Sequence, residues 1–303
     1  MTTNLALRDT SFEPVSRRID RLPPARRLAD AAVWALIAEA ELTPKPALVD
    51  GRGSGAHRDL SLDAMRRSAW SLHPSFQAMA LAAAGRRPER SLRAELAVLG
   101  RAAEPAMMAA TGGSNAHRGA IWAVGLLVAA TAMNPGDRAE EIGARAGRIA
   151  FFPDRFMPAA PSHGQSAAAR YGVAGARGEA QLGFPHAVGI GLPVLRQGLA
   201  AGLSPAHARL DALMAIMASL DDTCLLHRGG LAALQAGKSG AQAVLDAGGA
   251  ASPAGSRALA ALHDRLMTLN ASPGGAADML AAALFLDRVT KPMSVTEAFR
   301  WKS

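Results

Sequence analysis

The amino-acid sequence predicts an all-α protein, on three observations of composition and pattern. Hydrophobic residues occupy 50% of the 303 positions, whereas aromatic residues occupy only 4%. Alanine, leucine and methionine dominate the apolar residues, and they form helices readily and strands poorly. No segment shows the strict alternation of polar and apolar residues that indicates a half-buried strand. We therefore expect a single large multi-helix domain over residues 25–303, after a loosely ordered extension over residues 1–24.

The first helices are predicted from apolar composition and from the residues that interrupt them. An Ala-rich helix follows the prolines at 23–24 and ends before the Pro- and Gly-rich segment 42–60, whose prolines forbid a helix. Ser61 or Asp63 starts another helix, which Pro74 kinks or breaks. Beyond Arg90, apolar residues recur at spacings of four, three and four, which is typical of one helix face. The residues on that face are Leu92, Leu96, Leu99 and Ala103.

The second half continues as helices separated by short polar turns. Ser204-Pro205 and Ser272-Pro273 each have the pattern of an N-cap followed by a first-turn proline. Helices are expected near residues 116–132, 138–150, 163–181, 186–201, 205–226, 239–247, 254–270 and 275–288. We expect the polar Gly- and Pro-rich loops between these helices to form the functional site.

Charge and cysteine content limit the class of partner. The formal net charge is +8, which attracts anionic partners, but the arginines are scattered and aromatic stacking residues are few. Small anionic substrates therefore fit better than nucleic acid. One cysteine excludes an intrachain disulfide.

The N-terminal residues lack the apolar core of a signal peptide, and the longest apolar stretch, 119–133, is short of the ~18 residues of a membrane span. We expect a cytoplasmic protein that does not bind membranes.

The segment 109–120 carries the strongest indication of a binding site. Two flexible glycines, Gly112 and Gly113, follow Thr111 and lead to a helix start that Ser114 or Asn115 can cap. The positive end of a helix and its free N–H groups favour anions. His117 and Arg118 add a proton-carrying and a cationic side chain in the first turn. The pattern favours a phosphate site, although an ordinary capped loop has similar residues.

Three further groups of polar residues interrupt apolar helices. In segment 42–60, Lys45 could hold a phosphate, whereas Asp50, His57 or Asp59 could move a proton or bind a cation; a solvated loop is the alternative. Glu104 precedes a proline beside two methionines, and a carboxylate buried there needs a partner. The remaining candidates for substrate binding lie beside glycines: Arg177, Glu179 and Arg228.

Two aspartates fall on apolar helix faces. Asp221 continues the stripe of Leu210, Met214 and Met217, and Asp278 precedes Ala281, Ala282 and Phe285 by three, four and seven residues. Carboxylates that project inward from different helices suit Mg²⁺, with substrate phosphates completing its shell. We therefore predict Asp221, Asp222 and Asp278 as metal ligands, with structural salt bridges to arginine as the alternative.

Taken together, these polar groups and their surroundings resemble the triphosphoribosyl-dephospho-CoA synthase family, and the resemblance covers about residues 27–288. Walker, zinc-peptidase and esterase motifs are absent. Ala47 and Ser114 stand where the family pattern has Gly and Val. The resemblance is carried by Leu42-Thr43-Pro44-Lys45-Pro46 with Val49-Asp50, Gly55-Ala56-His57 with Asp59, Ala110-Thr111-Gly112-Gly113 with Asn115, His117 and Arg118-Gly119-Ala120, Gly175 with Arg177-Gly178-Glu179, Gly183-Phe184-Pro185, Asp222-Thr223 with His227-Arg228-Gly229, and Ser272-Pro273-Gly274-Gly275 with Ala277-Asp278.

The resemblance implies an all-α enzyme that joins ATP to 3′-dephospho-CoA and releases adenine. Its product is the prosthetic-group precursor for an acyl carrier protein, of malonate decarboxylase in preference to citrate lyase. We expect Lys45, Arg118 and the amides of 112–115 to bind triphosphate, and Glu104 or His117 to transfer protons. The alternatives are an ADP-ribose glycohydrolase-like enzyme with a carboxylate-bound metal, or a basic helical nucleic-acid-binding module. The oligomeric state, a homodimer included, is left open by the sequence.

Overall fold

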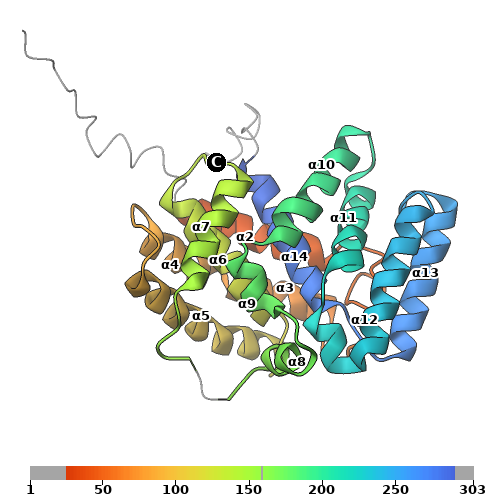
Figure 1. The fold of residues 1–303 in the computed structure, drawn as a ribbon, viewed down its shortest axis with the longest axis horizontal. Coiled ribbons are helices and arrows are strands. Elements are labelled where there is room, and N and C mark those ends of the chain that lie inside the picture. Colours follow the sequence, from red (N-terminus) through yellow and green to blue (C-terminus); the bar gives the residue numbers. More distant parts are fainter. Residues whose placement is uncertain (1–24, 158–159, 291–303) are drawn as a thin grey trace, which may run out of the picture.

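Every regular element in the residues that the structure describes is a helix. The structure is a computed structural model that describes residues 25–157 and 160–290 (Figure 1). Within these ranges the only extended pairing is an isolated bridge between Asp50 and Gly53. The predicted all-α class is confirmed. The expected extension over residues 1–24 lies outside the described residues, as do residues 291–303.

Most helices follow one another with short connections, and the loop over residues 41–61 is the longest connection that the structure describes in full. The first half contains α2 (Ala25–Ala40), α3 (Leu62–Ser71), α4 (His73–Ala83), α5 (Arg90–Thr111), α6 (Arg118–Met133) and α7 (Ala139–Phe151). The second half contains α8 (His163–Tyr171), α9 (Gly175–Gln181), the π-helical turn η1 (His186–Gly191), α10 (Leu192–Ala200), α11 (Pro205–Ser219), α12 (Thr223–Asp246), α13 (Pro253–Thr268) and α14 (Gly274–Thr290).

Helices α6 and α14 form the centre of the molecule. Both are apolar on nearly all sides, which is the pattern of a helix buried within a domain. They pack against each other, and α2 packs against both. Helices α4, α5 and α7 cover α6, whereas η1, α10 and α11 cover α14. At the other end of the molecule, α12 packs between α13, α11 and α8 (Figure 1).

Capping residues set several helix starts as the sequence predicted. Ser61 and Ser204 accept hydrogen bonds from backbone N–H groups in the first turns of α3 and α11. The break between α3 and α4 lies at Leu72, as expected from the proline that follows. No helix in the described part of the chain is both long and apolar enough to cross a bilayer.

Two predicted helices are each divided in the structure. The helix expected over 163–181 stops at Gly172, whose left-handed φ of 68° ends α8. The helix expected over 205–226 ends at Ser219 and resumes at Thr223. The reason is Asp222, whose extended backbone and side chain form the N-cap of α12. Periodicity alone did not reveal this interruption.

Candidate active site

The loop after α2 is built around the carboxylate of Asp50. Its oxygens accept hydrogen bonds from the backbone N–H groups of Lys45 at 2.7 Å and Arg52 at 2.8 Å, and from the Arg52 guanidinium at 2.8 Å. Burial raises the pKa of Asp50, but these hydrogen bonds outweigh it and leave the pKa below its ordinary value. The structure thus places Asp50, which we expected to move a proton or bind a cation, as the residue that holds the loop together.

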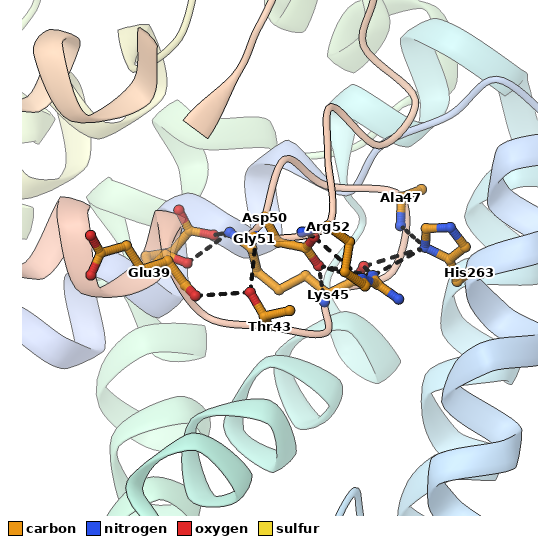
Figure 2. A network of polar contacts seen from close by, with 9 residues as sticks. Glu39, Thr43, Lys45, Ala47, Asp50, Gly51, Arg52 and His263 are labelled. Carbon is orange, nitrogen blue, oxygen red and sulfur yellow. Dashed lines mark hydrogen bonds and ion pairs between the residues drawn. The ribbon is translucent and has the colours of Figure 1, made fainter. Parts of the chain in front are cut away.

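Lys45 turns back from this loop to the end of α2. Its Nζ donates to Glu39 Oε1 at 2.6 Å and to the Glu39 carbonyl oxygen at 2.7 Å, and both side chains are buried. Figure 2 shows the network, with Glu39 at one end and His263 at the other. Two of the three ammonium hydrogens are therefore used by Glu39, so Lys45 has little capacity left for a phosphate.

Glu39 is a site residue that the sequence analysis missed. It lies in the last turn of α2, on the buried face that also carries Leu28, Ala32 and Leu36. A carboxylate on an apolar stripe is the same signal that identified Asp278, and applying it to α2 would have found Glu39.

The glycine turn between α5 and α6 has the structure of an anion-facing helix start. Gly112 has a φ of 70° and ends α5, and the Thr111 hydroxyl donates to the Ser114 carbonyl oxygen at 2.5 Å. The N-cap residue of α6 is His117, and its side chain makes no capping hydrogen bond, so neither Ser114 nor Asn115 is the N-cap. Asn115 Oδ1 nevertheless accepts the backbone N–H of Arg118, the first residue of α6, at 3.1 Å. The Arg118 guanidinium donates to Glu104 Oε2 at 2.9 Å. Glu104 is only half-buried, on α5, and orients Arg118 beside the turn.

His117 is buried directly before α6. Its Nδ1 lies 2.7 Å from the Ser68 hydroxyl, and its Nε2 has no hydrogen-bond partner among the described residues. Burial, together with the positive charge of Lys45, lowers the pKa of His117 to about 4. The imidazole is therefore neutral at pH 7, and one ring nitrogen is free to interact with a bound molecule.

Asp222 connects the starts of two helices. One carboxylate oxygen accepts the N–H groups of Cys224 at 2.8 Å and Leu225 at 3.4 Å in α12, and the other accepts the N–H of Ala276 in α14 at 2.9 Å. Burial nevertheless raises the pKa of Asp222. Because both oxygens accept hydrogen bonds from backbone N–H groups, this aspartate positions the first turn of α14, and Asp278 follows directly after that turn.

Asp278 packs directly against the first turn of α6. A Cβ placed on Gly119 would lie 1.9 Å from Asp278 Oδ2, so this contact requires glycine at position 119. Among the described residues, Asp278 has no hydrogen-bond or ion-pair partner. Burial, followed by the charges of Glu39 and Asp222, raises its pKa well above the ordinary value. A carboxyl group with a raised pKa and no hydrogen-bond partner is suited to donating a proton to a bound substrate.

A second polar group joins the loop over residues 41–61 to the segment before α14. His57 Nε2 lies 2.9 Å from the Ser272 hydroxyl, and the Arg228 guanidinium donates to the Ala56 carbonyl oxygen at 2.6 Å. Burial and the charge of Arg228 lower the pKa of His57. Asp59 is exposed and 3.9 Å from His57 Nδ1. Ser272, expected as an N-cap, instead contacts His57.

The structure separates Asp221 from the other predicted metal ligands. The expectation that Asp221 continues a buried helix face is wrong, because α11 ends at Ser219. Asp221 is exposed and forms an ion pair with Lys238 at 2.5 Å. No three His, Cys, Asp or Glu side chains in the described ranges are placed to hold a metal ion. A cation at Asp278 would therefore need substrate oxygens in its coordination shell.

Arg177 and Glu179, predicted to act together, face different surroundings. Glu179 is buried and accepts hydrogen bonds from the backbone N–H of His186 at 2.9 Å and from its Nδ1 at 2.7 Å, which fixes the start of η1. Arg177 is exposed on α9 and makes no ion pair with a described residue.

The candidate active site is the group formed by Glu39, Lys45, His117, Gly119 and Asp278. Electrostatic interactions couple Lys45 to His117 and Glu39 to Asp278, and the Gly119 contact joins α6 to α14. An open hollow beside α7, lined by residues that include Arg145 and Phe151, contains none of this group. We therefore place the chemistry where the polar side chains converge.

Comparisons with known proteins agree with the resemblance seen in the sequence. The family model described as CitG, ATP:dephospho-CoA triphosphoribosyl transferase, matches residues 25–297. A protein of Azotobacter vinelandii is 58% identical over 278 residues, which cover 91% of this chain and 95% of the relative. A protein of Pseudomonas paraeruginosa is 58% identical over 264 residues, covering 86% and 90% of the two chains.

These relatives carry one description. Both proteins, and one of Pseudomonas fluorescens that is 55% identical over 90% of this chain and 94% of its own length, are named "Probable 2-(5''-triphosphoribosyl)-3'-dephosphocoenzyme-A synthase". No solved structure matches this chain.

Proposed function

Since the chain belongs to the ATP:dephospho-CoA triphosphoribosyl transferase family, we propose that it transfers the 5-triphosphoribosyl group of ATP to the 2′-hydroxyl of 3′-dephospho-CoA and releases adenine. The bond between C1′ of ATP and adenine N9 breaks, and a bond from C1′ to the 2′-oxygen of dephospho-CoA forms. The observation that carries the proposal is Asp278, a carboxyl group with a strongly raised pKa at the start of two buried helices.

Asp278 supplies both proton transfers in this proposal. Its raised pKa keeps it protonated before reaction, so it gives its proton to the departing adenine. The carboxylate that results stabilises the positive charge developing at C1′, as in glycoside cleavage. It then accepts the proton of the attacking 2′-hydroxyl, so that protons balance over the reaction.

The first turn of α6 binds the triphosphate in this proposal. Arg118, oriented by Glu104 at 2.9 Å, faces the anion together with the N–H groups of residues 114–115. The N–H groups of Gly112 and Gly113, which we also expected to bind phosphate, instead donate to the Met108 carbonyl oxygen at the end of α5. Lys45 acts through its ion pair with Glu39, since it holds that carboxylate beside Asp278 and supplies positive charge to the site. The neutral His117 offers Nε2 for a hydrogen bond to the substrate.

We propose Mg²⁺ as the cofactor, bound together with the triphosphate. Of the three predicted ligands, only Asp278 has both carboxyl oxygens without a hydrogen-bond partner among the described residues. Because the proposed reaction uses its proton, we place Asp278 beside the ion and assign the coordination of Mg²⁺ to the triphosphate oxygens. Asp221 and Asp222 are engaged with Lys238 and with backbone N–H groups. When bound, Mg²⁺ would neutralise phosphate charge and hold the triphosphate in place.

The product would serve as the prosthetic-group precursor of an acyl carrier protein, and we favour the malonate decarboxylase pathway over that of citrate lyase. A cytoplasmic location is consistent with the use of ATP. A homodimer stays a prediction.

Incubation of the full-length chain with ATP, Mg²⁺ and 3′-dephospho-CoA tests the proposed reaction. Mass spectrometry should detect free adenine and the triphosphoribosyl adduct in equal amounts. Omission of dephospho-CoA should abolish adenine release. Adenine release at the full rate without dephospho-CoA would indicate a ribosyl hydrolase instead, and no release in either reaction would contradict the proposal.

A further inference from the structure

Three arginines from α5 and α9 lie close enough to interact electrostatically, and one of them is stacked on Trp122, one helical turn beyond Arg118 on α6. Arg93 and Arg101 lie on α5, and Arg177 lies on α9. The Arg93 guanidinium is stacked over the Trp122 ring, with its Cζ 5.1 Å from the ring centroid. The indole N–H of Trp122 donates to the Ala176 carbonyl oxygen at 3.0 Å, which fixes the ring against α9. The sequence analysis selected only Arg177 from this group.

Arg93 lacks the partners that a buried guanidinium normally has. Only 8% of the surface of Arg93 is exposed, and its buried Nε has no hydrogen-bond partner in the described part of the chain. No ion pair to a described residue compensates its charge. Leaving a buried charge unpaired is expensive, so such a group is expected where a ligand supplies the missing acceptor.

The charges around Arg93 leave an excess of positive charge. Asp154 is the carboxylate that faces this group, and it is already bound to Arg101 at 2.5 Å. Arg93 and Arg177 therefore lack a carboxylate partner among the described residues. Burial, with repulsion from Arg101 and Arg177, lowers the pKa of Arg93 in spite of Asp154. A bound anion would relieve both the repulsion and the unmet hydrogen bonds.

We propose that Arg93, Arg101 and Arg177 bind the diphosphate of 3′-dephospho-CoA, the acceptor substrate. This assignment depends on the proposed function, which requires two polyanionic substrates and therefore two anion subsites. The start of α6 is given to the triphosphate of ATP. Trp122 follows Arg118 by four residues, a rise of about 6 Å along the helix. The acceptor's diphosphate is joined to C5′ of the ribose whose 2′-hydroxyl attacks, so it must lie about a sugar's width from the reacting carbon.

Equilibrium binding by the full-length chain tests the subsite without any chemistry. Titration calorimetry with 3′-dephospho-CoA should show at least tenfold weaker binding for Arg177→Ala and for Arg93→Met, because each removes charged hydrogen bonds to phosphate. The matched control is Arg148→Ala, an exposed arginine on α7 that removes the same charge elsewhere and should change the dissociation constant less than twofold. Pantetheine, which contains no phosphate, should bind all four proteins equally.

The stability of Arg93→Met separates a binding role from a structural one. Methionine preserves apolar volume and removes an unpaired charge, so the melting temperature should stay the same or rise. A lower melting temperature with unchanged affinity for dephospho-CoA would overturn the proposal. Because Arg177 is exposed, Arg177→Ala keeps the test decisive if Arg93→Met does not fold.

Two further results would locate the error if the inference fails. Weaker binding of ATP with unchanged binding of dephospho-CoA would overturn the assignment of this subsite to the acceptor. Adenine release by the wild-type chain reports on the proposed function independently. If that release is normal while the Arg93 and Arg177 variants bind dephospho-CoA like the wild type, only the subsite proposal is wrong.

Discussion

Asp50 and Asp278 are two carboxyl groups in the same molecule with opposite surroundings. Asp50 accepts two backbone N–H groups and the Arg52 guanidinium, and its pKa lies below the ordinary value. Asp278 has no hydrogen-bond partner among the described residues, and burial beside Glu39 and Asp222 raises its pKa well above the ordinary value. The first carboxylate organises a loop, whereas the second is left available for a bound substrate.

The comparison shows why burial alone does not identify a catalytic carboxylate. Asp222 is also buried with a raised pKa, yet both of its oxygens cap helices. A catalytic group needs unused hydrogen-bonding capacity in addition to a perturbed pKa. Asp278 and His117 Nε2 meet both conditions.

Replacement of the free carboxyl group should give the largest effect on activity. We expect Asp278→Asn to reduce the rate of adenine release by about 10³-fold, because an amide can neither donate nor accept the transferred proton. Mass spectrometry of adenine measures the rate, and circular dichroism should show an unchanged helical spectrum. A variant with wild-type turnover would remove Asp278 from the mechanism.

Breaking the ion pair beside Asp278 should give the largest effect on stability. Lys45→Met leaves Glu39 buried without its counter-ion, and we expect the free energy of unfolding to fall by about 3 kcal/mol. The double variant Glu39→Gln/Lys45→Met should recover most of this loss in urea denaturation. If the single variant is as stable as the wild type, the two groups do not form a buried pair in solution.

The pH dependence of stability should distinguish the two aspartates by sign. The lowered pKa of Asp50 gives stability that is present above about pH 4 and lost as the pH falls through the folded-state pKa. The raised pKa of Asp278 has the opposite effect, since its stability contribution is present below about pH 4 and lost as the pH rises through the folded-state pKa.

Thermal unfolding of matched asparagine variants between pH 4 and 8 measures this difference. Asp50→Asn should cost about 2 kcal/mol at pH 7, with a smaller penalty in acid. Asp278→Asn should unfold at a higher temperature than the wild type at pH 8, and the difference should shrink towards pH 4. If the melting temperatures of the two variants, relative to the wild type, changed with pH in the same direction, the pKa values of Asp50 and Asp278 would not be shifted in opposite directions.

The smallest effect is expected at the exposed aspartate. Asp221→Asn removes a surface ion pair with Lys238, and we expect a stability change below about 0.5 kcal/mol and unchanged adenine release. A large loss of activity on this substitution would restore Asp221 as a metal ligand and would show that the site extends beyond the group around Asp278.

Local sequence signals predicted much of the fold because they act through neighbouring residues. Ser61, Ser204 and Asn115 make the expected contacts with backbone N–H groups, and Gly112 ends α5. The extrapolation of a helix face to Asp221 was wrong because the next residue, Asp222, begins another helix. Periodicity assumes that the helix continues, and a capping residue can interrupt it.

Site residues were harder to predict where their roles depend on distant partners. Lys45 was expected to face phosphate, but its partner Glu39 lies in the preceding helix and was not considered. Arg93 lies in a charged stretch at the start of α5, where an arginine attracts no notice, and only its contact with Trp122 and its proximity to Arg177 give it significance. Spacing along one helix contains no information about such contacts.

By itself, the sequence determined the all-α class, most helix starts and stops, and the set of polar loops, since propensity, capping and proline effects are local. Tertiary structure alone decided which polar groups are satisfied. The packing of α14 on α6 brings Asp278 against Gly119 and near Glu39, and the packing of α5 and α9 on α6 places Arg93 over Trp122 and near Arg177. The physical reason is that desolvation and electrostatic coupling depend on distances in space between residues far apart in the chain.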